Sequence, residues 1–377
     1  MGLINDKICY TYDDVTIMPC RISDIEHRSE CIPYDENGML PLFTAPMNTV
    51  VGIDNFDKFQ KEKIYPILPR TEDIRTRLTF SFEEDKWAAY SLSEFEEYFC
   101  KEENKRITDK RIRVLIDIAN GHMKKILDLV KIAKSMYGDK LIIMAGNIAN
   151  PNTYEDYAEV GIDFVRCSIG TGNGCLSSSN LGVHVPIVSL IDDIVNVRNR
   201  ISNSYAKLPK IVADGGIRNY RDIIKALALG ADYVMVGSVF AKMLESSASK
   251  KCTSLDWVTL PYDLKFEELD LNAIYKEDGD WYATYNSETI FLGDIIATFY
   301  GMASREGQIA LNGSKTKTSE GILKELKVEY TMNGWVTNLT DYLRSAMSYV
   351  GVRTLDDFRK NSTLMINSPN AVSAVNK

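Results

Sequence analysis

Cys175 is the side chain in this sequence best placed to react, because it ends the glycine-rich loop 170–175. Backbone N–H groups in such a loop favour the thiolate, which is the nucleophilic form of cysteine. Cys167 lies in an apolar stretch instead, which is typical of the small buried cysteines that only fill space. The sequence therefore predicts that Cys175 is a catalytic nucleophile acting on a flat substrate.

Other common reactive groups are scarce. The seven cysteines include no C-x-x-C pair, and no two of the three histidines (His27, His122 and His184) stand four residues apart. This spacing argues against a histidine-based zinc site and against a Ser-His-Asp hydrolase. We therefore expect the reactive groups to be cysteine, carboxylates or a bound cofactor.

The overall composition is that of a globular protein. The 377 residues are 45% hydrophobic and 25% charged, and the formal net charge is −8. A negative body repels nucleic acids and anionic membranes, so neither is expected as a partner, and any bound phosphate should be a single one held by backbone amides. With no apolar run of membrane-spanning length and no signal-peptide pattern, the expected location is the cytoplasm.

Short apolar runs alternate with helical periodicity through the middle of the chain, as in the helical segments 123–137 and 220–229. This alternation is typical of a parallel sheet covered by helices, and eight runs favour an α/β fold of the (β/α)8 TIM-barrel type within a single domain spanning residues 1–377. The expected strands are Leu42–Pro46, Lys63–Leu68, Trp87–Ser91, Val114–Ile118, Leu141–Met144, Phe164–Ser168, Ile211–Ala213 and Tyr233–Val236.

Small and polar loops follow five of these strands, at 117–121, 145–147, 170–175, 214–216 and 237–238. Each could be a simple turn. Barrel enzymes, however, keep their active sites at the carboxyl ends of the strands, and glycines there let the backbone approach a ligand closely. Five such loops on one side of a barrel favour an active site.

The chain departs from a plain barrel after the eighth strand. Residues 250–296 are expected to form an insertion with a β-hairpin that turns at 277–280. Residues 305–320 are expected to form a mobile loop over the active site, 337–350 the last helix, and 361–377 a frayed tail.

Six short motifs carry a resemblance to a known family: Thr11–Val15, Ala45–Val50, Gly170–Cys175, Ala213–Ile217, Met235–Ser238 and Tyr300–Ser304. With these motifs in this order, residues 7–360 resemble the IMP dehydrogenases and GMP reductases, barrel enzymes that act at C2 of a purine mononucleotide. The resemblance implies that Cys175 attacks C2 to form a covalent thioimidate. It also implies a monovalent cation such as K⁺ on the carbonyls of Gly170, Gly172 and Cys175.

The resemblance further implies residues that hold the nucleotide, with Asp214 on the ribose, glycine amides and the Tyr300 hydroxyl on the 5′-phosphate, and residues 301–303 beside the base. The implied substrate-binding residues are Asn173, Asp214, Gly215, Gly216, Gly237, Ser238, Tyr300, Gly301, Met302, Ala303, Ser319 and Gly321.

Within this family the sequence is most similar to GMP reductases. Dehydrogenases activate water with an Arg-Tyr pair on a long flap, whereas the segment between Ser304 and Ser319 has 14 residues and no tyrosine. A reductase uses a hydroxyl and a carboxylate to move protons at the leaving amine, and Ser177 and Glu320 stand at those positions. The segment between Arg70 and Val114 is also too short for the regulatory CBS module that many dehydrogenases insert there.

The reductase resemblance implies NADPH as cofactor, with NADH as an alternative, and a homotetramer in which the cofactor crosses a subunit boundary. The implied cofactor-binding residues are Arg28, Asp117, Ile118, Ala119, Ile169, Gly170, Ser345 and Ser348.

The sequence also departs from the family pattern, at Asn48, Asn173, Ser178 and Ile187. These departures leave three alternatives open. They are a dehydrogenase with an unusual water-activating group, an enzyme that acts on a modified purine nucleotide, and a nucleotide-binding homologue without catalysis.

Overall fold

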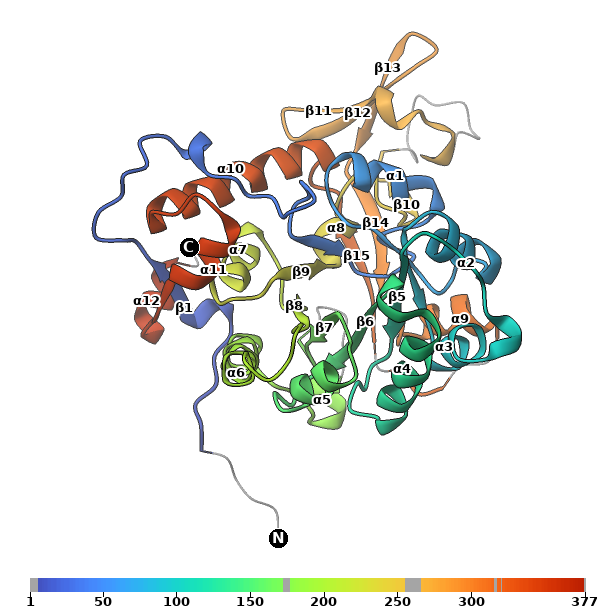
Figure 1. Ribbon diagram of the computed structural model, residues 1–377. Coiled ribbons are helices and arrows are strands. Elements are labelled where there is room, and N and C mark those ends of the chain that lie inside the picture. Colours follow the sequence, from blue (N-terminus) through green and yellow to red (C-terminus); the bar gives the residue numbers. More distant parts are fainter. Residues whose placement is uncertain (1–5, 172–176, 255–265, 315–316, 320, 376–377) are drawn as a thin grey trace.

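A parallel eight-stranded sheet forms the centre of the computed structural model, which describes residues 6–171, 177–254, 266–314, 317–319 and 321–375 (Figure 1). The strand order is β2-β9-β8-β7-β6-β5-β4-β3, and a parallel bridge between Phe43 and Tyr65 brings the two edge strands together. The predicted (β/α)8 barrel is confirmed. The strands are β2 (Leu42–Thr44), β3 (Ile67–Leu68), β4 (Trp87–Tyr90), β5 (Ile112–Asp117), β6 (Leu141–Ile148), β7 (Phe164–Cys167), β8 (Lys210–Asp214) and β9 (Tyr233–Val236).

The strands are apolar on both faces because each face packs against side chains. Aromatic rings fill the barrel at the amino ends of the strands, where Phe43 contacts Trp87, Phe164 and Tyr233 with ring centroids 5.1 to 5.8 Å apart. A second and larger cluster lies between the strands and the surrounding helices. This double burial explains why the strands read as continuous apolar runs.

Helices follow most strands and cover the outside of the barrel. They are α1 (Ile53–Lys61), α2 (Ile74–Glu83), α3 (Leu92–Phe99), α4 (Lys124–Tyr137), α5 (Thr153–Glu159), α6 (Ile187–Arg200), α7 (Tyr220–Ala228), α8 (Ser238–Ala241) and α10 (Met332–Val350). The start expected for the last of these, residue 337, is wrong, because the Thr331 hydroxyl accepts a hydrogen bond from the Gly334 amide and caps the helix earlier. Among the described residues, no helix has the length and apolar character needed to cross a membrane.

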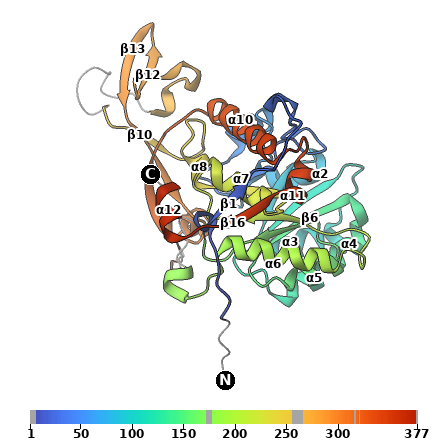
Figure 2. The same ribbon diagram turned by 90° about the vertical axis from the view of Figure 1, so that its left-hand side faces the viewer.

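The expected insertion contributes strands to two small antiparallel sheets. One joins β10 (Lys250–Cys252), β14 (Ile295–Tyr300) and β15 (Leu323–Lys327), and the other joins β11 (Ile274–Glu277), β12 (Asp280–Tyr285) and β13 (Glu288–Gly293). Asp278 and Gly279 both have positive φ, which matches the right-handed twist of a two-residue hairpin, so the predicted hairpin is confirmed. This part has its own hydrophobic cluster around Trp281 and projects from the barrel (Figure 2).

Two expectations about the end of the chain differ from the structure. Residues 305–312 form helix α9 (Arg305–Asn312) rather than a loop, because the buried Ser304 hydroxyl caps it by accepting the Gly307 amide hydrogen. Helix α11 (Leu355–Asn361) leads into the tail expected to be frayed, which itself contains β16 (Thr363–Ile366) and α12 (Pro369–Val375). Strand β16 pairs antiparallel with β1 (Val15–Met18), so backbone hydrogen bonds hold the tail against the start of the chain.

Candidate active site

Arg166 is the centre of a charged network at the carboxyl ends of the barrel strands. It lies on β7, and its guanidinium donates hydrogen bonds to Asp117 Oδ1 at 2.8 Å and to Asp214 Oδ2 at 2.9 Å. Burial opposes the charge, but the two carboxylates outweigh burial and raise the pKa of Arg166 above its ordinary value. The side chain is 8% exposed, so the network is a fixed part of the site.

Asp214 at the end of β8 is held through one oxygen only. Its Oδ2 accepts from Arg166 and from Asn147 Nδ2, the latter at 2.7 Å. Among the described residues no hydrogen bond to Oδ1 is formed, and 16% of the side chain is exposed. Asp214 therefore presents an oriented carboxylate oxygen that can accept hydrogen bonds from a ligand.

A bulge in β6 aims Asn147 at this network. The register with β7 shifts between Ala145 and Ile148, and Gly146 within the shift has φ +134°. A Cβ atom at Gly146 would lie 2.5 Å from the Arg166 carbonyl oxygen. Only glycine permits this approach, so the bulge and the position of Arg166 depend on each other.

The loop after β5 joins the same end of the barrel. The backbone N–H of Asn147 donates to the Ile118 carbonyl at 2.9 Å, while Ala119 is exposed. Arg70, which follows β3, donates to the Asp117 carbonyl at 3.4 Å, and its buried Nε has no partner among the described residues. The structure thus brings Asp117, Ile118 and Ala119 beside the Arg166 network.

The loops after β7 and β8 contact each other. The Gly216 amide donates to the Thr171 carbonyl at 3.1 Å, and Gly170 has φ +79°. A Cβ atom at Gly170 would lie 2.9 Å from the Val183 carbonyl, so a larger residue would not fit there. Because the Gly216 amide already has a partner, a phosphate could use it only if the bond to Thr171 broke.

The N-terminal motif supports the Gly216 loop from the side. Tyr12, in a short helical turn at Tyr12–Asp14, is buried with its ring against Gly216. Lys225 donates to the Tyr12 carbonyl at 2.7 Å, and Arg218 contacts Asp13 at 2.7 Å. The motif therefore stabilises the loop after β8 through packing and polar contacts.

Tyr300 lies at the end of β14 beside the loop after β2. Asn48 Nδ2 donates to the Tyr300 hydroxyl at 2.8 Å, which leaves the hydroxyl proton of Tyr300 free to point elsewhere. Gly237 approaches the same loop, since a Cβ atom there would lie 3.5 Å from Ala45 Cβ. The neighbouring Ser238 is buried.

Helix α9 holds residues 301–303 and 317–319 together. A Cβ atom at Gly307 would lie 2.6 Å from the Gly301 carbonyl oxygen, so only glycine permits this packing. Gln308 donates to the Ala303 and Thr318 carbonyls at 3.2 and 3.4 Å. A Cβ atom at Gly301 would meet no atom within 4 Å, so the described structure leaves open space next to this residue.

The structure does not describe several of the predicted site residues. Cys175, Gly172, Asn173 and Glu320 lie outside the described residues. The backbone of Ser177 begins a π-helical turn, Ser177–Leu181. Among the described residues, no group of three histidine, cysteine or acidic side chains could hold a metal ion. Cys167 is buried, and burial raises the pKa of its thiol well above the ordinary value, in agreement with a space-filling role.

Comparison with known proteins relates the middle of the chain to one family. Residues 97–255 match the family described as "IMP dehydrogenase / GMP reductase domain". The chain is 27% identical over 361 residues to a GMP reductase of Staphylococcus carnosus, covering 93% of this chain and 94% of that protein. Residues 97–255 thus form a domain of the IMP dehydrogenase / GMP reductase family.

The match to the dehydrogenases of the family is shorter. The chain is 32% identical over 249 residues to an inosine-5′-monophosphate dehydrogenase of Borreliella burgdorferi, covering 66% of this chain and 53% of that protein. The alignment covers 44% of the dehydrogenase of Chlorobaculum parvum. The chain therefore spans about half the length of these dehydrogenases.

Three residues predicted to bind the cofactor lie away from the strand ends. Arg28 donates to the Ser345 hydroxyl at 3.3 Å and forms an ion pair with Asp341 at 3.0 Å, and Ser348 contacts Ser23. Among the described residues, no hydrogen bond or ion pair links this cluster to Arg166. In this family member the cluster belongs to α10 and the N-terminal segment.

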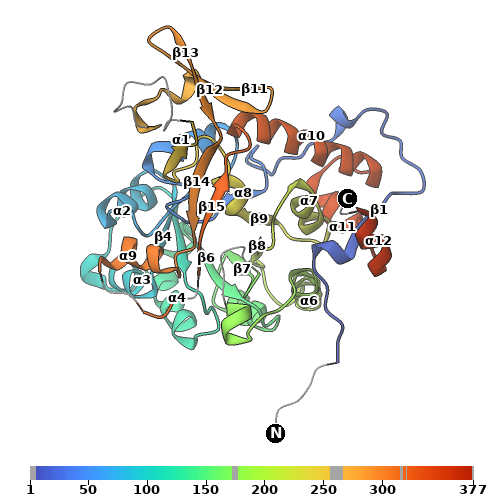
Figure 3. The same cartoon turned by 180° about the vertical axis from the view of Figure 1, so that it is seen from behind.

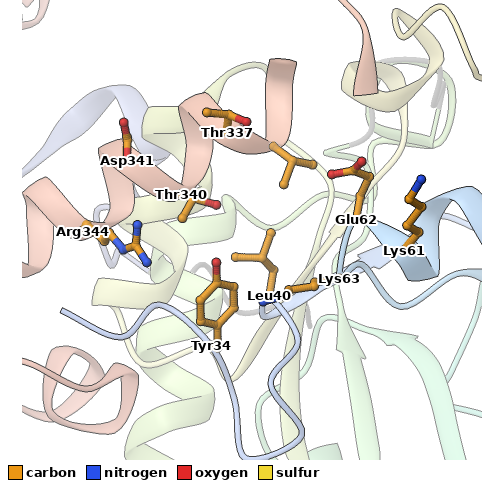
Figure 4. A pocket seen from close by; sticks show the side chains of 10 residues that line it. Tyr34, Leu40, Lys61, Glu62, Lys63, Thr337, Thr340, Asp341 and Arg344 are labelled. Carbon is orange, nitrogen blue, oxygen red and sulfur yellow. The ribbon is translucent and has the colours of Figure 1, made fainter. Parts of the chain in front are cut away.

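A pocket of about 240 Å³ lies next to this cluster, between α10 and the segments before β2 and β3 (Figure 4). Arg344 and Asp341 line it from α10, and Tyr34 lies opposite them. Lys63 stacks on the Tyr34 ring at 4.3 Å, and Asn333 contacts Glu62 at 3.3 Å. Its lining combines charged side chains with the apolar Leu40 and Val336, and it includes no residue of the Arg166 network.

Sequence reasoning missed Arg166 and Arg70 as parts of the site, and it named Asn147 only as a member of the strand-end loop 145–147. The available signal was Arg166 itself, a cation within the apolar run Phe164–Cys167. A charged residue in a buried strand must have partners, because an unpaired buried charge is very costly. Such a residue indicates acidic partners on neighbouring strands.

Proposed function

We propose that this protein is a purine-nucleotide oxidoreductase, and specifically a GMP reductase that converts GMP and NADPH to IMP, ammonia and NADP⁺. The observation that carries the proposal is the short connection between Ser304 and Ser319. It contains no tyrosine, and its described part is mostly the compact helix α9. A dehydrogenase of this family needs an Arg-Tyr pair there to activate water.

The extent of similarity supports the same choice. The chain aligns over nearly the full length of proteins named GMP reductase, from Staphylococcus carnosus and, at 23% identity over 363 residues, from Mycoplasma mycoides. The dehydrogenases align over about half of their length. A purine nucleotide is therefore proposed as substrate.

The nucleotide is proposed to bind across the strand ends. Asp214 Oδ1 accepts hydrogen bonds from the ribose hydroxyls, because Oδ2 is already committed to Arg166 and Asn147. The Tyr300 hydroxyl donates to the 5′-phosphate, and Ser238 and the Gly237 backbone add donors. The base occupies the open space beside Gly301.

The covalent step is proposed for Cys175. Its thiolate forms a bond to C2 of the purine, and the 2-amino group leaves as ammonia with a proton that Ser177 and Glu320 deliver. A hydride then adds to C2, the sulfur–carbon bond breaks, and the thiolate is restored as IMP leaves. Serine supplies the same donor and acceptor capacity as threonine in this proton transfer.

The residues near Asp117 fit a nicotinamide cofactor. Ala119 is exposed and carries only a methyl group, so it leaves a surface that a planar ring can approach. Bound there, the cofactor supplies the hydride. Asp117 is oriented by Arg166 at 2.8 Å and can accept a hydrogen bond from the ring amide or ribose.

The proposal has three further parts. The cofactor is NADPH rather than NADH, a monovalent cation binds the carbonyls of loop 170–175, and the protein assembles into a homotetramer. A loop of this kind leaves carbonyl groups without backbone partners, and a cation such as K⁺ can satisfy them.

The decisive experiment compares two assays of the purified chain. With GMP and NADPH we expect loss of absorbance at 340 nm and release of one ammonia per NADPH consumed. With IMP and NAD⁺ we expect no turnover. Mass spectrometry of protein quenched during turnover should locate a purine adduct on Cys175. Turnover of IMP alone would favour a dehydrogenase, and nucleotide binding without either reaction would favour a non-catalytic homologue.

A further inference from the structure

Most of the net charge of the protein lies in one part of the insertion, residues 266–296. Residues 266–296 contain eight acidic side chains and a single lysine, a net charge of −7, whereas the whole chain has −8. The remainder of the chain is therefore almost neutral. A charge concentrated in one small projecting unit creates a local field that attracts cations.

The outer face of the sheet β11-β12-β13 presents a row of aromatic rings. Tyr275 pairs with Tyr282 across the strands and Tyr282 with Phe291, with ring centroids 5.8 and 5.4 Å apart. Tyr275 is 38% and Phe291 49% exposed. The alternate residues Ala283 and Ile290 face the buried side, so the core already has its own apolar face.

Unpaired carboxylates flank this row. Glu277 and Asp280 are paired across the hairpin at one end, with Asp278 in the turn, and Glu288 begins β13 at the other end. Among the described residues none of the four forms an ion pair. Partial desolvation and the carboxylates at 277, 278 and 280 raise the pKa of the Tyr282 hydroxyl, in keeping with their closeness to the rings.

The row also stands clear of the rest of the molecule. In Figures 2 and 3 the three strands project from the barrel on the side of β10 and β14, far from the helices α3 to α6. Lys276 is turned away from the row, because it donates to the Glu329 carbonyl at 3.0 Å and lies over the Trp281 ring. The outer face therefore lacks a cation of its own among the described residues.

We propose that this face, which we call the aromatic row (Tyr275, Tyr282 and Phe291), binds an extended, arginine-rich segment of a partner protein. Guanidinium groups stack on exposed aromatic rings and form bidentate hydrogen bonds with carboxylates, so they match both features at once. A nucleic acid would be repelled by the carboxylates. A second copy of the sheet would bring −7 against −7, which disfavours self-association through this face.

The test uses fluorescence anisotropy with the full chain and a labelled twelve-residue peptide of alternating Arg and Ser. We expect a Kd in the micromolar range at 50 mM salt and at least tenfold weaker binding at 300 mM salt, since exposed charges are screened. A peptide with Lys for Arg should bind severalfold less tightly, because ammonium groups neither stack nor bind bidentately. A peptide with Gln for Arg should not bind.

Two sets of variants locate the site. Tyr275→Ser with Phe291→Ser, and separately Glu277→Gln with Asp278→Asn, should each weaken binding of the Arg peptide at least tenfold. The Asn-Gly turn in the second variant keeps the hairpin geometry. Tyr349→Ser, which removes a tyrosine that is 70% exposed on α10, is the matched control and should bind normally.

Circular dichroism verifies that each variant is folded, and the salt titration of the unaltered chain does not depend on any variant. The proposal is overturned if the Arg peptide does not bind the unaltered chain or binds both variants equally well. It is also overturned if the Gln peptide or an uncharged oligosaccharide binds as tightly, or if sedimentation shows that the variants break up an oligomer.

Discussion

The Arg166 guanidinium bonds to a single oxygen of Asp214, with Nη2 at 2.9 Å and Nε at 3.3 Å from Oδ2. This one-sided contact fixes the carboxylate and leaves its second oxygen available to a ligand. A buried arginine between two carboxylates is also a point on which local stability depends, because removing it leaves like charges facing each other.

The first prediction concerns Arg166→Met. We expect a loss of about 3–5 kcal/mol in the free energy of unfolding, measured with urea, and a KM for GMP raised at least tenfold. Arg77→Met is the matched control, because Arg77 is equally buried and pairs with Glu94 at 2.7 Å outside the barrel mouth. It should lose stability without a change in KM. Equal effects on KM would contradict a role for Arg166 in the site.

The second prediction concerns Cys175. Cys175→Ala should abolish turnover while the Kd for GMP changes less than threefold. In the unaltered protein, iodoacetamide at pH 7 should label Cys175 first, and GMP should slow the labelling. Cys100 is the internal reference, because burial raises the pKa of its thiol to about 12 and keeps it protonated. Persisting activity in Cys175→Ala would remove it as nucleophile.

The third prediction compares two glycines with positive φ. Gly138→Ala should cost about 1 kcal/mol, the strain of the backbone alone, because a Cβ atom there meets nothing within 4 Å. Gly146→Ala should cost more than twice as much and raise the KM for GMP, because its Cβ would displace the Arg166 backbone. Thermal unfolding with steady-state kinetics measures both effects. Similar values for the two variants would show that the close approach carries no function.

The fourth prediction is a pH dependence at Lys250. Burial lowers the pKa of its ammonium to about 8, while neighbouring carboxylates such as Glu245 only partly oppose this. The unfolded chain therefore binds more protons than the folded chain between about pH 8 and pH 10.5, and stability rises with pH in that window. We expect the stability of the unaltered protein relative to Lys250→Met to increase from pH 7.5 to pH 10. A difference in stability between the two proteins that does not change with pH would contradict the lowered pKa of Lys250.

The strands and the barrel were predictable because each strand is an apolar run of its own, independent of its partners. The strand-end loops were predictable because their small and polar residues begin where each apolar run ends. Helix α9 was not, because its sequence is polar and contains Gly307, whose packing on Gly301 is a tertiary contact. Strand β16 was missed because four residues become a strand only when β1, more than three hundred residues earlier, pairs with them.

The candidate site was predicted in outline through motifs that resemble a family, with Asp117, Asp214 and Tyr300 at the strand ends. Arg166 was overlooked because apolar periodicity describes which faces are buried and says nothing about charge pairing across strands. The bulge at Gly146 depends on contacts between β6 and β7, which local sequence does not encode.

The pairing of β1 with β16 also makes circular permutation of this protein feasible. Because Val15 lies opposite Ile366, strands β1 and β16 bring a segment near the start of the chain beside one near its end. A short flexible linker could join them, and new ends could be opened in the tight turn at Asp278 and Gly279. Such a circular permutant should keep the barrel intact, since no strand of the central sheet would be cut.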